Sequence, residues 1–195
     1  MAALNFLRNN GRRNVSAIYF NHGTKHGSEA EAFVKAYCSS QSIPLALGRV
    51  SGPCPKGESK EAFWRTERYA FFKRVHYSDD FQKHYLRPIV TCHHLDDQVE
   101  TWLFTSMHGN PRLIPYQRDY FIRPFLLTRK NYLEKWAESR GVPHIFDPSN
   151  NDTDNYMRNF IRHEVVPKAL RVNPGLHKVV KKKILDQYNK TMDCF

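Results

Sequence analysis

The sequence predicts an α/β fold, a parallel sheet flanked by helices, and two observations support the prediction. Short β-rich apolar runs alternate with stretches of helical periodicity in units of roughly 30–45 residues. Polar clusters directly follow two of the apolar runs, at strand-to-helix turns. Ligands of parallel sheets bind outside the carboxyl ends of the strands. A functional site is therefore expected at this edge of the sheet.

Four apolar runs are expected to form strands, at residues 15–20, 43–47, 87–92 and 120–122. Pro44 has no backbone N–H, so pairing of the second strand should be confined to its later residues. The Pro- and Gly-rich residues 51–57 are expected to form a loop. Residues 142–146 are expected to be extended.

Helical spacing predicts helices at residues 28–40, 59–74, 95–107 and 128–140, and two more near the end of the chain. Gly141 should end the fourth helix. Ser28 and Glu31 are expected to form a capping box at the start of the first. The expected buried faces are Ala32, Phe33, Ala36 and Tyr37 in the first helix, and Phe63, Tyr69, Ala70 and Phe72 or their neighbours in the second.

The amino-acid composition changes after residue 146, and this change predicts the domain organisation. A length of 195 residues suits one domain with a small appendage. Residues 147–155 are polar and rich in turn formers. We expect an α/β domain at residues 1–150 and a helical extension at residues 151–195.

The composition, 41% hydrophobic and 25% charged, is typical of a folded globular protein. No run of about 18 apolar residues occurs, so no membrane association is expected. Residues 1–10 lack the pattern of a signal peptide. The four cysteines show no C-x-x-C spacing, which favours a reducing compartment. We therefore expect a cytoplasmic protein.

The chain is strongly basic, with 30 Lys and Arg against 19 Asp and Glu and a formal net charge of +11. Such an excess favours polyanionic partners such as nucleic acids, because Lys and Arg release counterions condensed on phosphates. A generally basic, soluble surface is the alternative. Lys178 and residues 181–183 extend the basic character of the last helix, or form an ordinary solvated end.

The densest polar cluster is C-H-H-L-D-D-Q-V-E-T at residues 92–101. Asp96 and Asp97 fit the first turn of a helix, where the helix dipole favours negative charge, so a well-capped helix explains them without a ligand. The side chains of His93 and His94 diverge, whereas structural zinc sites use spaced pairs. A carboxylate that holds Mg²⁺ beside phosphates is chemically easier.

A second cluster lies on the helix at residues 59–74. Arg65 and Arg68 stand three residues apart, and guanidinium groups so placed can bind phosphate oxygens bidentately. The alternative is ion pairing with Glu61 or Glu67 on a solvated face.

Two further stretches are candidate parts of a functional site. Residues 21–23, N-H-G, follow the first strand. Arg158 and Arg162 stand four residues apart on a helix whose other face is apolar, and a plain amphipathic helix is the alternative.

Together these stretches resemble the tRNA(Ile)-lysidine synthetases, a family of the PP-loop ATP-pyrophosphatase superfamily. The matching blocks occur in the family's order: N-H-G (21–23), W-R-x-x-R-Y (64–69), H-H-L-D-D-Q-x-E-T (93–101), I-R-P-F-L (122–126), D-P-S-N (147–150) and R-N-F-I-R (158–162). N-H-G or D-P-S-N alone is a weak signal. The third block followed by R-P-x-L and R-N-x-I-R is highly specific.

The resemblance implies an adenine nucleotide alpha hydrolase-like PP-loop fold and an ATP- and Mg²⁺-dependent ligase. Such enzymes adenylate C2 of the wobble cytidine, position 34, of a tRNA(Ile) with a CAU anticodon. The lysine ε-amine then displaces AMP and leaves lysidine. The implied partners are tRNA(Ile) and lysine, and a homodimer is one assembly that the sequence leaves open.

The resemblance also implies roles for individual residues. Asp97, Arg65 and Arg68 would be catalytic. Asp97 would bind Mg²⁺ and assist Mg²⁺–ATP chemistry or organise the activated base, and the two arginines would bind phosphate or the adenylated intermediate. The residues expected to line the ATP site are His22, Gly23, His93 and His94. Those expected to face tRNA or substrate are Arg123, Arg158, Asn159 and Arg162.

The sequence departs from the family in one respect. The S-G-G-x-D-S phosphate loop does not occur in it, and the amides of such a loop cradle pyrophosphate. We expect an N-terminally incomplete PP-loop domain, from an incomplete reading frame, a wrongly assigned start codon or an incomplete clone. We also expect no separate C-terminal tRNA-binding domains, and little ATP consumption or lysidine formation by these 195 residues alone.

Two alternatives remain open at this point. One is a non-catalytic tRNA- or RNA-binding derivative of the family. The other is a different PP-loop enzyme, such as a tRNA thiolase, against which the R-N-F-I-R block and the lack of C-x-x-C pairs argue.

Overall fold

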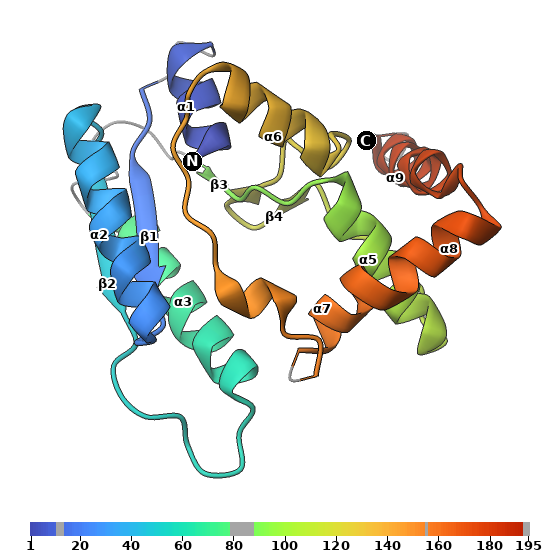
Figure 1. The fold of residues 1–195 in the computed structure, drawn as a ribbon, viewed down its shortest axis with the longest axis horizontal. Coiled ribbons are helices and arrows are strands. Elements are labelled where there is room, and N and C mark those ends of the chain that lie inside the picture. The colour runs from blue at the N-terminus through green and yellow to red at the C-terminus, as the bar shows by residue number, and fades with distance from the viewer. Residues whose placement is uncertain (11–13, 79–87, 155, 193–195) are drawn as a thin grey trace. The chain divides into compact units, whose positions relative to one another are not determined.

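The computed structural model describes residues 1–10, 14–78, 88–154 and 156–192. The chain divides into two compact units (Figure 1). Unit 1 comprises Met1–Arg87 and Val142–Ile145, and unit 2 comprises Pro88–Gly141 and Phe146–Phe195. Each unit is described separately.

Unit 1 is a parallel strand pair with helices on both faces. Its elements are α1 (Ala2–Asn9), β1 (Ala17–Asn21), α2 (Lys25–Ser40), β2 (Leu45–Arg49) and α3 (Lys60–His76). β1 pairs with β2 in the register Ala17 to Leu45. Because β2 begins directly after Pro44, the expected limit on its pairing is confirmed.

Alternation along the strands produces two cores in unit 1, since successive side chains point to opposite faces of a strand. Ala17 and Leu45 pack with Tyr37 and Cys38 of α2. On the other face, Phe20 packs with two residues of α3, Phe71 and Val75, and with Ala46 of β2.

Three local predictions for these helices are wrong. α2 begins at Lys25 rather than residue 28, because Thr24 caps it by accepting the Gly27 N–H. Ser28 therefore lies inside the helix, and the Glu31 carboxylate accepts a hydrogen bond from Asn21 instead of closing a capping box.

The expected buried face of α2 is also partly wrong: Ala32 and Ala36 are exposed, whereas Tyr37 is buried as expected and Cys38 is buried beside it. In α3, Ala70 is exposed and its neighbour Phe71 is buried, which the prediction allowed. Adjacent apolar residues satisfy helical spacing equally well, so contact with the sheet decides between them.

Unit 2 contains a three-stranded sheet in the order β3-β5-β4, with β3 (Ile89–Val90) parallel to β5 (Phe121–Ile122). β4 (Gln117–Arg118) pairs antiparallel to β5 and was not predicted, because two exposed residues carry no periodicity. Arg87, expected in the third strand, lies outside the described residues.

The helices of unit 2 are α5 (Leu95–Met107), α6 (Lys130–Ser139), a 3₁₀ turn (Pro148–Asn151), α7 (Met157–Phe160), a π-helical segment (Ile161–Val165), α8 (Val166–Val172) and α9 (Leu176–Met192). The predicted bounds of α5 are confirmed.

The core of unit 2 joins α5 to α9. Leu95 and Val99 of α5 pack with Leu176 and Val180 of α9. The helices after residue 150 therefore belong to the same compact unit as α5, and the unit boundaries differ from the expected boundary at residue 150.

The α/β class is confirmed: parallel strand pairs lie against helices, and the described elements are mostly helical. None of the described helices combines the length and hydropathy that a membrane span requires.

Candidate functional site

The first turn of α5 is fixed by a capping box in which a histidine takes the usual place of Ser or Thr. The His94 N–H donates to Asp97 Oδ2 at 2.9 Å, and the Asp97 N–H donates to His94 Nδ1 at 3.3 Å. Because Nδ1 accepts a hydrogen bond, the proton of a neutral ring lies on Nε2. The capped-helix interpretation of this cluster is therefore confirmed, and it includes His94.

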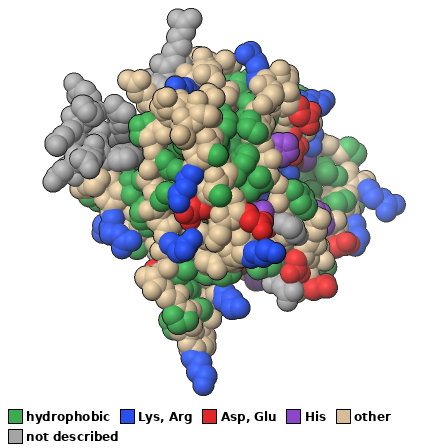
Figure 2. Space-filling model, turned by 60° about the vertical axis from the view of Figure 1, so that its left-hand side comes forward, with side chains coloured by type: hydrophobic (Ala, Val, Ile, Leu, Met, Phe, Trp, Pro, Cys, Tyr) green, Lys and Arg blue, Asp and Glu red, His purple; other side chains and the backbone are tan. Residues whose placement is uncertain are grey.

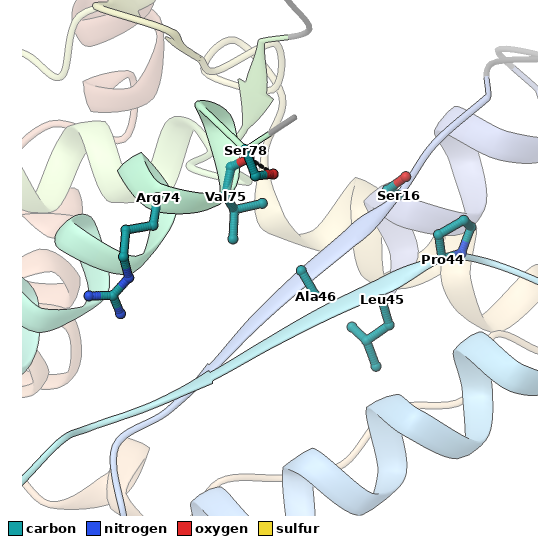
Figure 3. A pocket seen from close by; sticks show the side chains of 7 residues that line it. All are labelled: Ser16, Pro44, Leu45, Ala46, Arg74, Val75 and Ser78. Carbon is teal, nitrogen blue, oxygen red and sulfur yellow. Dashed lines mark hydrogen bonds between the residues drawn. The ribbon is translucent and has the colours of Figure 1, made fainter. Parts of the chain in front are cut away.

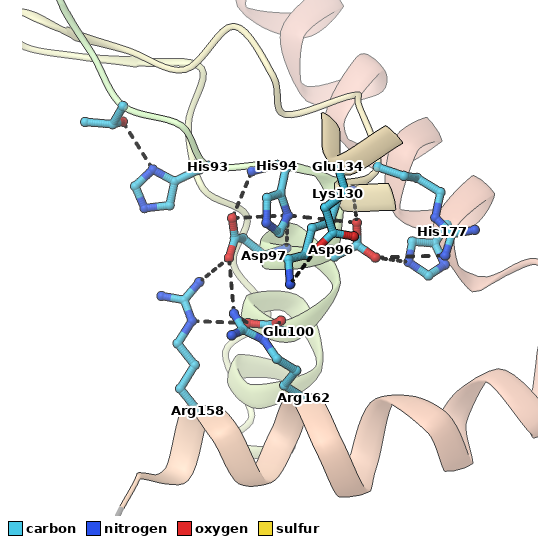
Figure 4. A network of polar contacts seen from close by, with 12 residues as sticks. His93, His94, Asp96, Asp97, Glu100, Lys130, Glu134, Arg158, Arg162 and His177 are labelled. Atoms are coloured by element: carbon cyan, nitrogen blue, oxygen red, sulfur yellow. Dashed lines mark hydrogen bonds and ion pairs between the residues drawn. The ribbon is translucent and has the colours of Figure 1, made fainter. Parts of the chain in front are cut away.

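The same turn forms a network with two arginines (Figure 4). The Nη2 of Arg158 donates to Asp97 Oδ1 at 2.9 Å, and its Nε donates to Glu100 Oε2 at 3.1 Å. Arg162 holds Glu100 bidentately, with Nε to Oε1 at 2.7 Å and Nη2 to Oε2 at 3.2 Å. The carboxylates stand three residues apart on α5 and the arginines four apart on the α7–π segment, so each pair shares a helix face.

Burial differs across the network and determines which group can move. The side chains of Asp97 and Glu100 are only 11% and 5% exposed, whereas that of Arg158 is 47% exposed. Hydrogen bonding to Glu100 raises the pKa of Arg162. Two guanidinium groups face two carboxylates, so the network is close to neutral overall. Arg158 is the member with most access to solvent.

Asp96, the neighbour of Asp97, connects three helices of unit 2. Its Oδ2 accepts the Lys130 N–H at the start of α6 at 2.8 Å, and its Oδ1 lies 3.1 Å from His177 Nε2 on α9. Burial by itself would raise the pKa of Asp96, but the bonds from Lys130 and His177 hold it below its ordinary value.

Sequence reasoning missed three members of this arrangement: Asp96, Glu100 and His177. Glu100 carried a signal, because a carboxylate three residues after Asp97 shares its helix face. His177 carried none, because it lies 81 residues from Asp96 in the chain.

Asn159 and Arg123, expected to face tRNA, bind the backbone of their own unit. Asn159 Nδ2 donates to the carbonyls of Ser149 and Asp152, so it holds the polar loop before α7. Arg123 is 5% exposed and its Nη1 donates to the Pro115 carbonyl. Both residues are placed to fix loops.

In unit 1, the turn after β1 is fixed by Asn21, which is fully buried. Its Oδ1 accepts the Gly23 N–H at 2.8 Å. Gly23 has φ of +78°, and a Cβ there would lie 3.1 Å from Val50 Cγ1. Glycine suits this backbone conformation because it lacks a Cβ.

His22 in this turn lies against aromatic rings. Its ring centroid is 5.3 Å from those of Phe20 and Trp64. Burial, followed by the positive charge of Arg68, holds the pKa of His22 below its ordinary value. The surroundings of His22, which are aromatic rings and the Arg68 charge, therefore favour the neutral form of its ring.

Arg65 and Arg68 lie over the ring of Tyr69, with the two Cζ atoms 4.8 and 5.7 Å from its centroid. Within the described parts of the chain, neither forms an ion pair, and Glu67 accepts from the Ser51 hydroxyl instead. Neither arginine therefore forms a contact ion pair with Glu61 or Glu67, although the charge of Glu61 acts on Arg68 from a longer distance. Burial is the main cause that lowers the pKa of Arg68.

The described residues do not fit a dedicated metal site. Residues 1–10, 14–78, 88–154 and 156–192 contain no group of three His, Cys, Asp or Glu side chains that could hold an ion. Asp97, the expected Mg²⁺ ligand, already accepts the His94 N–H with Oδ2 and Arg158 with Oδ1. Direct ligation by Asp97 would have to use the remaining lone pairs of these two oxygens, beside the positive charge of Arg158.

One cavity of unit 1, of about 510 Å³, lies away from the expected residues (Figure 3). It is lined by Ser16, Pro44, Leu45, Ala46, Arg74, Val75 and Ser78. These residues precede or begin the strands and end α3, whereas His22 follows the carboxyl end of β1. The cavity contains none of the predicted site residues.

The structure thus gathers the predicted residues into two groups. His94, Asp97, Arg158 and Arg162 form one bonded network in unit 2, and His93 lies beside it in the chain with Nδ1 3.1 Å from Thr91 Oγ1. His22 contacts Trp64 and lies near Arg68 in unit 1.

The fold agrees with comparisons to known proteins, and these comparisons define the class of the protein. The PP-loop domain family matches residues 1–169, and the chain belongs to this family. Its relatives include tRNA(Ile)-lysidine synthases from Thermotoga sp. (strain RQ2), 32% identical over 174 residues, and Geobacillus kaustophilus, 31% identical over 185 residues. The aligned regions cover 85% and 88% of this chain but 41% and 38% of those relatives.

Another such synthase, from Francisella tularensis subsp. novicida, is 32% identical over 173 residues, covering 82% of this chain and 41% of its own length. The chain therefore spans about two fifths of the length of the curated relatives that it matches.

Proposed function

We propose that this chain acts in tRNA modification as the catalytic part of a tRNA(Ile)-lysidine synthetase-type ligase. The substrates would be ATP, lysine and a tRNA(Ile) with a CAU anticodon, and the enzyme would act in the cytoplasm. The observation that carries the proposal is the network in which Asp97 and Glu100 hold Arg158 and Arg162 at the start of α5. The family membership and the named relatives support it.

The proposed reaction has two steps. The O2 atom of cytidine 34 attacks the α-phosphorus of ATP and pyrophosphate leaves. The lysine ε-amine then attacks C2, and AMP leaves with the O2 atom. Both steps need cationic groups near phosphate oxygens, because negative charge lies on the phosphate in each.

Arg158 is the residue of the network best suited to phosphate. Its guanidinium is planar and can bind a phosphate bidentately, and nearly half of its side chain is exposed. Within the described residues, its Nη1 donates to no other group. Movement of Arg158 onto phosphate would free Asp97 Oδ1, which is then available to accept a proton from the lysine ammonium.

Arg65 and Arg68 are proposed to bind phosphate from unit 1, since among the described residues neither forms a contact ion pair and both lie over the Tyr69 ring, although the charge of Glu61 acts on Arg68 from a longer distance. His22 and Gly23, together with His93 and His94, are proposed to contact the nucleotide. Mg²⁺ would enter with ATP, held by phosphates and water, as this ion usually is.

The test is lysine-dependent release of AMP from ATP with tRNA(Ile), comparing a CAU anticodon with GAU in the same tRNA. The 195-residue chain and a version preceded by a strand and an S-G-G-x-D-S loop are assayed side by side. We expect both to bind tRNA, and the extended version to release AMP only with lysine and the CAU anticodon. Binding without AMP release from either version would favour the non-catalytic alternative.

A further inference from the structure

The outward face of α9 carries lysines that the proposed reaction does not use. Lys178, Lys181 and Lys182 are all exposed, and we call them the α9 lysine face. Residues 165–185 contain no Asp or Glu. The cationic residues of this stretch are Lys168, Arg171, Lys178, Lys181, Lys182 and Lys183.

Helix geometry separates the lysine face from the core. Val180 is fully buried against α5 and Leu176 lies one turn before it. At about 100° per residue, Lys178 and Lys182 point away from Val180, and Lys181 lies at their flank. Lys183 is different, because its Nζ lies over the Trp102 ring at 5.6 Å.

The lysine face has few acidic neighbours along its own helix, where Asp186, four residues after Lys182, is the first acidic residue to follow it. Across the described ranges, Lys178, Lys181 and Lys182 form no ion pair, whereas Lys168 is paired with Glu164 at 3.0 Å. The Asp97–Arg158 network is close to neutral and adds little attraction for a polyanion. On the molecular face in Figure 2, Lys and Arg are scattered among other side chains. The lysine face instead concentrates three lysine charges on one helix.

We propose that the α9 lysine face binds the phosphate backbone of tRNA, away from the base that is modified; that the polyanion is tRNA rests on the proposed function. Lys178 and Lys182 are separated by about 6 Å along the helix axis, so they can contact different phosphates. A membrane surface fits less well, because basic helices that bind membranes bury their apolar face in lipid. In α9, Leu176 and Val180 are already buried in the core of unit 2, and the apolar side chains left partly exposed, Val179, Leu185 and Tyr188, do not form a continuous face with them.

Phosphate contacts position RNA without reading its sequence. Each contact adds about 0.7–0.9 to the slope of log affinity against log salt. Loss of the lysine face should therefore weaken binding of different tRNAs alike and reduce the slope by about 2–3.

The test compares two triple variants of the full chain that lose the same charge. The first is Lys178→Gln, Lys181→Gln and Lys182→Gln. The control is Lys56→Gln, Lys73→Gln and Lys135→Gln, which removes exposed lysines from three separate elements. Binding of fluorescent tRNA(Ile) with a CAU anticodon, and of an unrelated tRNA, is measured from about 50 to 200 mM salt, the range over which phosphate contacts dominate affinity.

We expect the lysine-face variant to bind both tRNAs about tenfold more weakly at the lowest salt, with the reduced slope. The control substitutions should change the tRNA affinity and the salt slope much less. Thermal unfolding should show that both variants are folded. Equal losses in the two variants, or wild-type binding by the first, would overturn the proposal. Failure of the proposed function would appear separately, as no AMP release by the version preceded by the S-G-G-x-D-S loop while the lysine-face effect persists.

Discussion

Replacement of Glu100 by Gln tests whether the buried network stabilises unit 2. The change keeps the shape of the side chain but removes its charge and turns one acceptor oxygen into an N–H₂ donor. Glu100 is 4% exposed and accepts from Arg158 Nε and twice from Arg162. In the variant, an amide donor would face a guanidinium donor in a buried position.

The expected loss in the free energy of unfolding follows from how deeply each partner of Glu100 is buried. Breaking a fully buried ion pair costs about 3–5 kcal/mol. Arg158 and Arg162 are 47% and 28% exposed, so water can solvate them after the change. We therefore expect a loss of about 2–3 kcal/mol in the free energy of unfolding, which for a chain of this size lowers Tm by about 4–12 °C.

The assay is urea unfolding followed by circular dichroism, with Glu134→Gln as the matched control. Glu134 pairs with Lys130 at 3.2 Å on the surface, where both side chains are more than half exposed. The control should lose less than about 0.5 kcal/mol, as exposed pairs do. A double-variant cycle with Arg162→Gln should give a coupling energy above about 1 kcal/mol. Equal destabilisation by the two Gln substitutions would refute the reasoning.

Three further predictions concern Asp97, Glu31 and Gly23. In a version of the chain that releases AMP, Asp97→Asn should lose most activity but still bind tRNA, because the lost charge acts on Arg158 and on proton transfer; unchanged turnover would remove Asp97 from the mechanism. Glu31 has a pKa lowered to about 2 by hydrogen bonds from Lys35 and Asn21. Its stabilisation is therefore present above pH 4.5, its unperturbed pKa, and is lost as pH falls toward about 2. The difference in unfolding free energy between wild type and Glu31→Gln should shrink over that window, and a difference independent of pH would contradict the assignment. Gly23→Ala should destabilise the chain by about 1–2 kcal/mol in chemical denaturation, because φ is +78° and Val50 is close. The control is Gly57→Ala: Gly57 also has a positive φ but has open space around it, so the comparison separates backbone strain from the steric contact.

Local features could be predicted where residues adjacent in the sequence determine them. The bounds of α5 follow from a cap and a first turn formed within one short stretch, and Pro44 limits β2 through its own missing N–H. In α2, Ala32 and Ala36 were wrongly expected to be buried, because contact with β1 and β2 decides which of several adjacent apolar residues faces the core. The two-residue strand β4 is too short to show any pattern.

In the candidate site, too, some residues could be predicted from the sequence and others only from tertiary contacts. The sequence indicated that Asp97, Arg158 and Arg162 carry the chemistry, and their family motifs were readable without any structure. The spacing placed Glu100 on the helix face of Asp97, but only the structure showed that Arg158 and Arg162, 58 and 62 residues away, converge on it. Arg123 has the same charge as Arg158 but lies buried on a carbonyl, which no spacing rule distinguishes.

The sequence by itself determined the α/β class, the family and the first turn of α5, because these depend on local spacing and on motifs that occur in a fixed order. Only the tertiary structure decided which carboxylate meets which cation. Asp96 reaches His177 on α9, Glu100 reaches both arginines, and Lys183 lies on Trp102 while its neighbours stay in solvent. These pairings depend on how α5 packs against distant helices, and the free energy of that packing is not encoded in any single stretch of the chain.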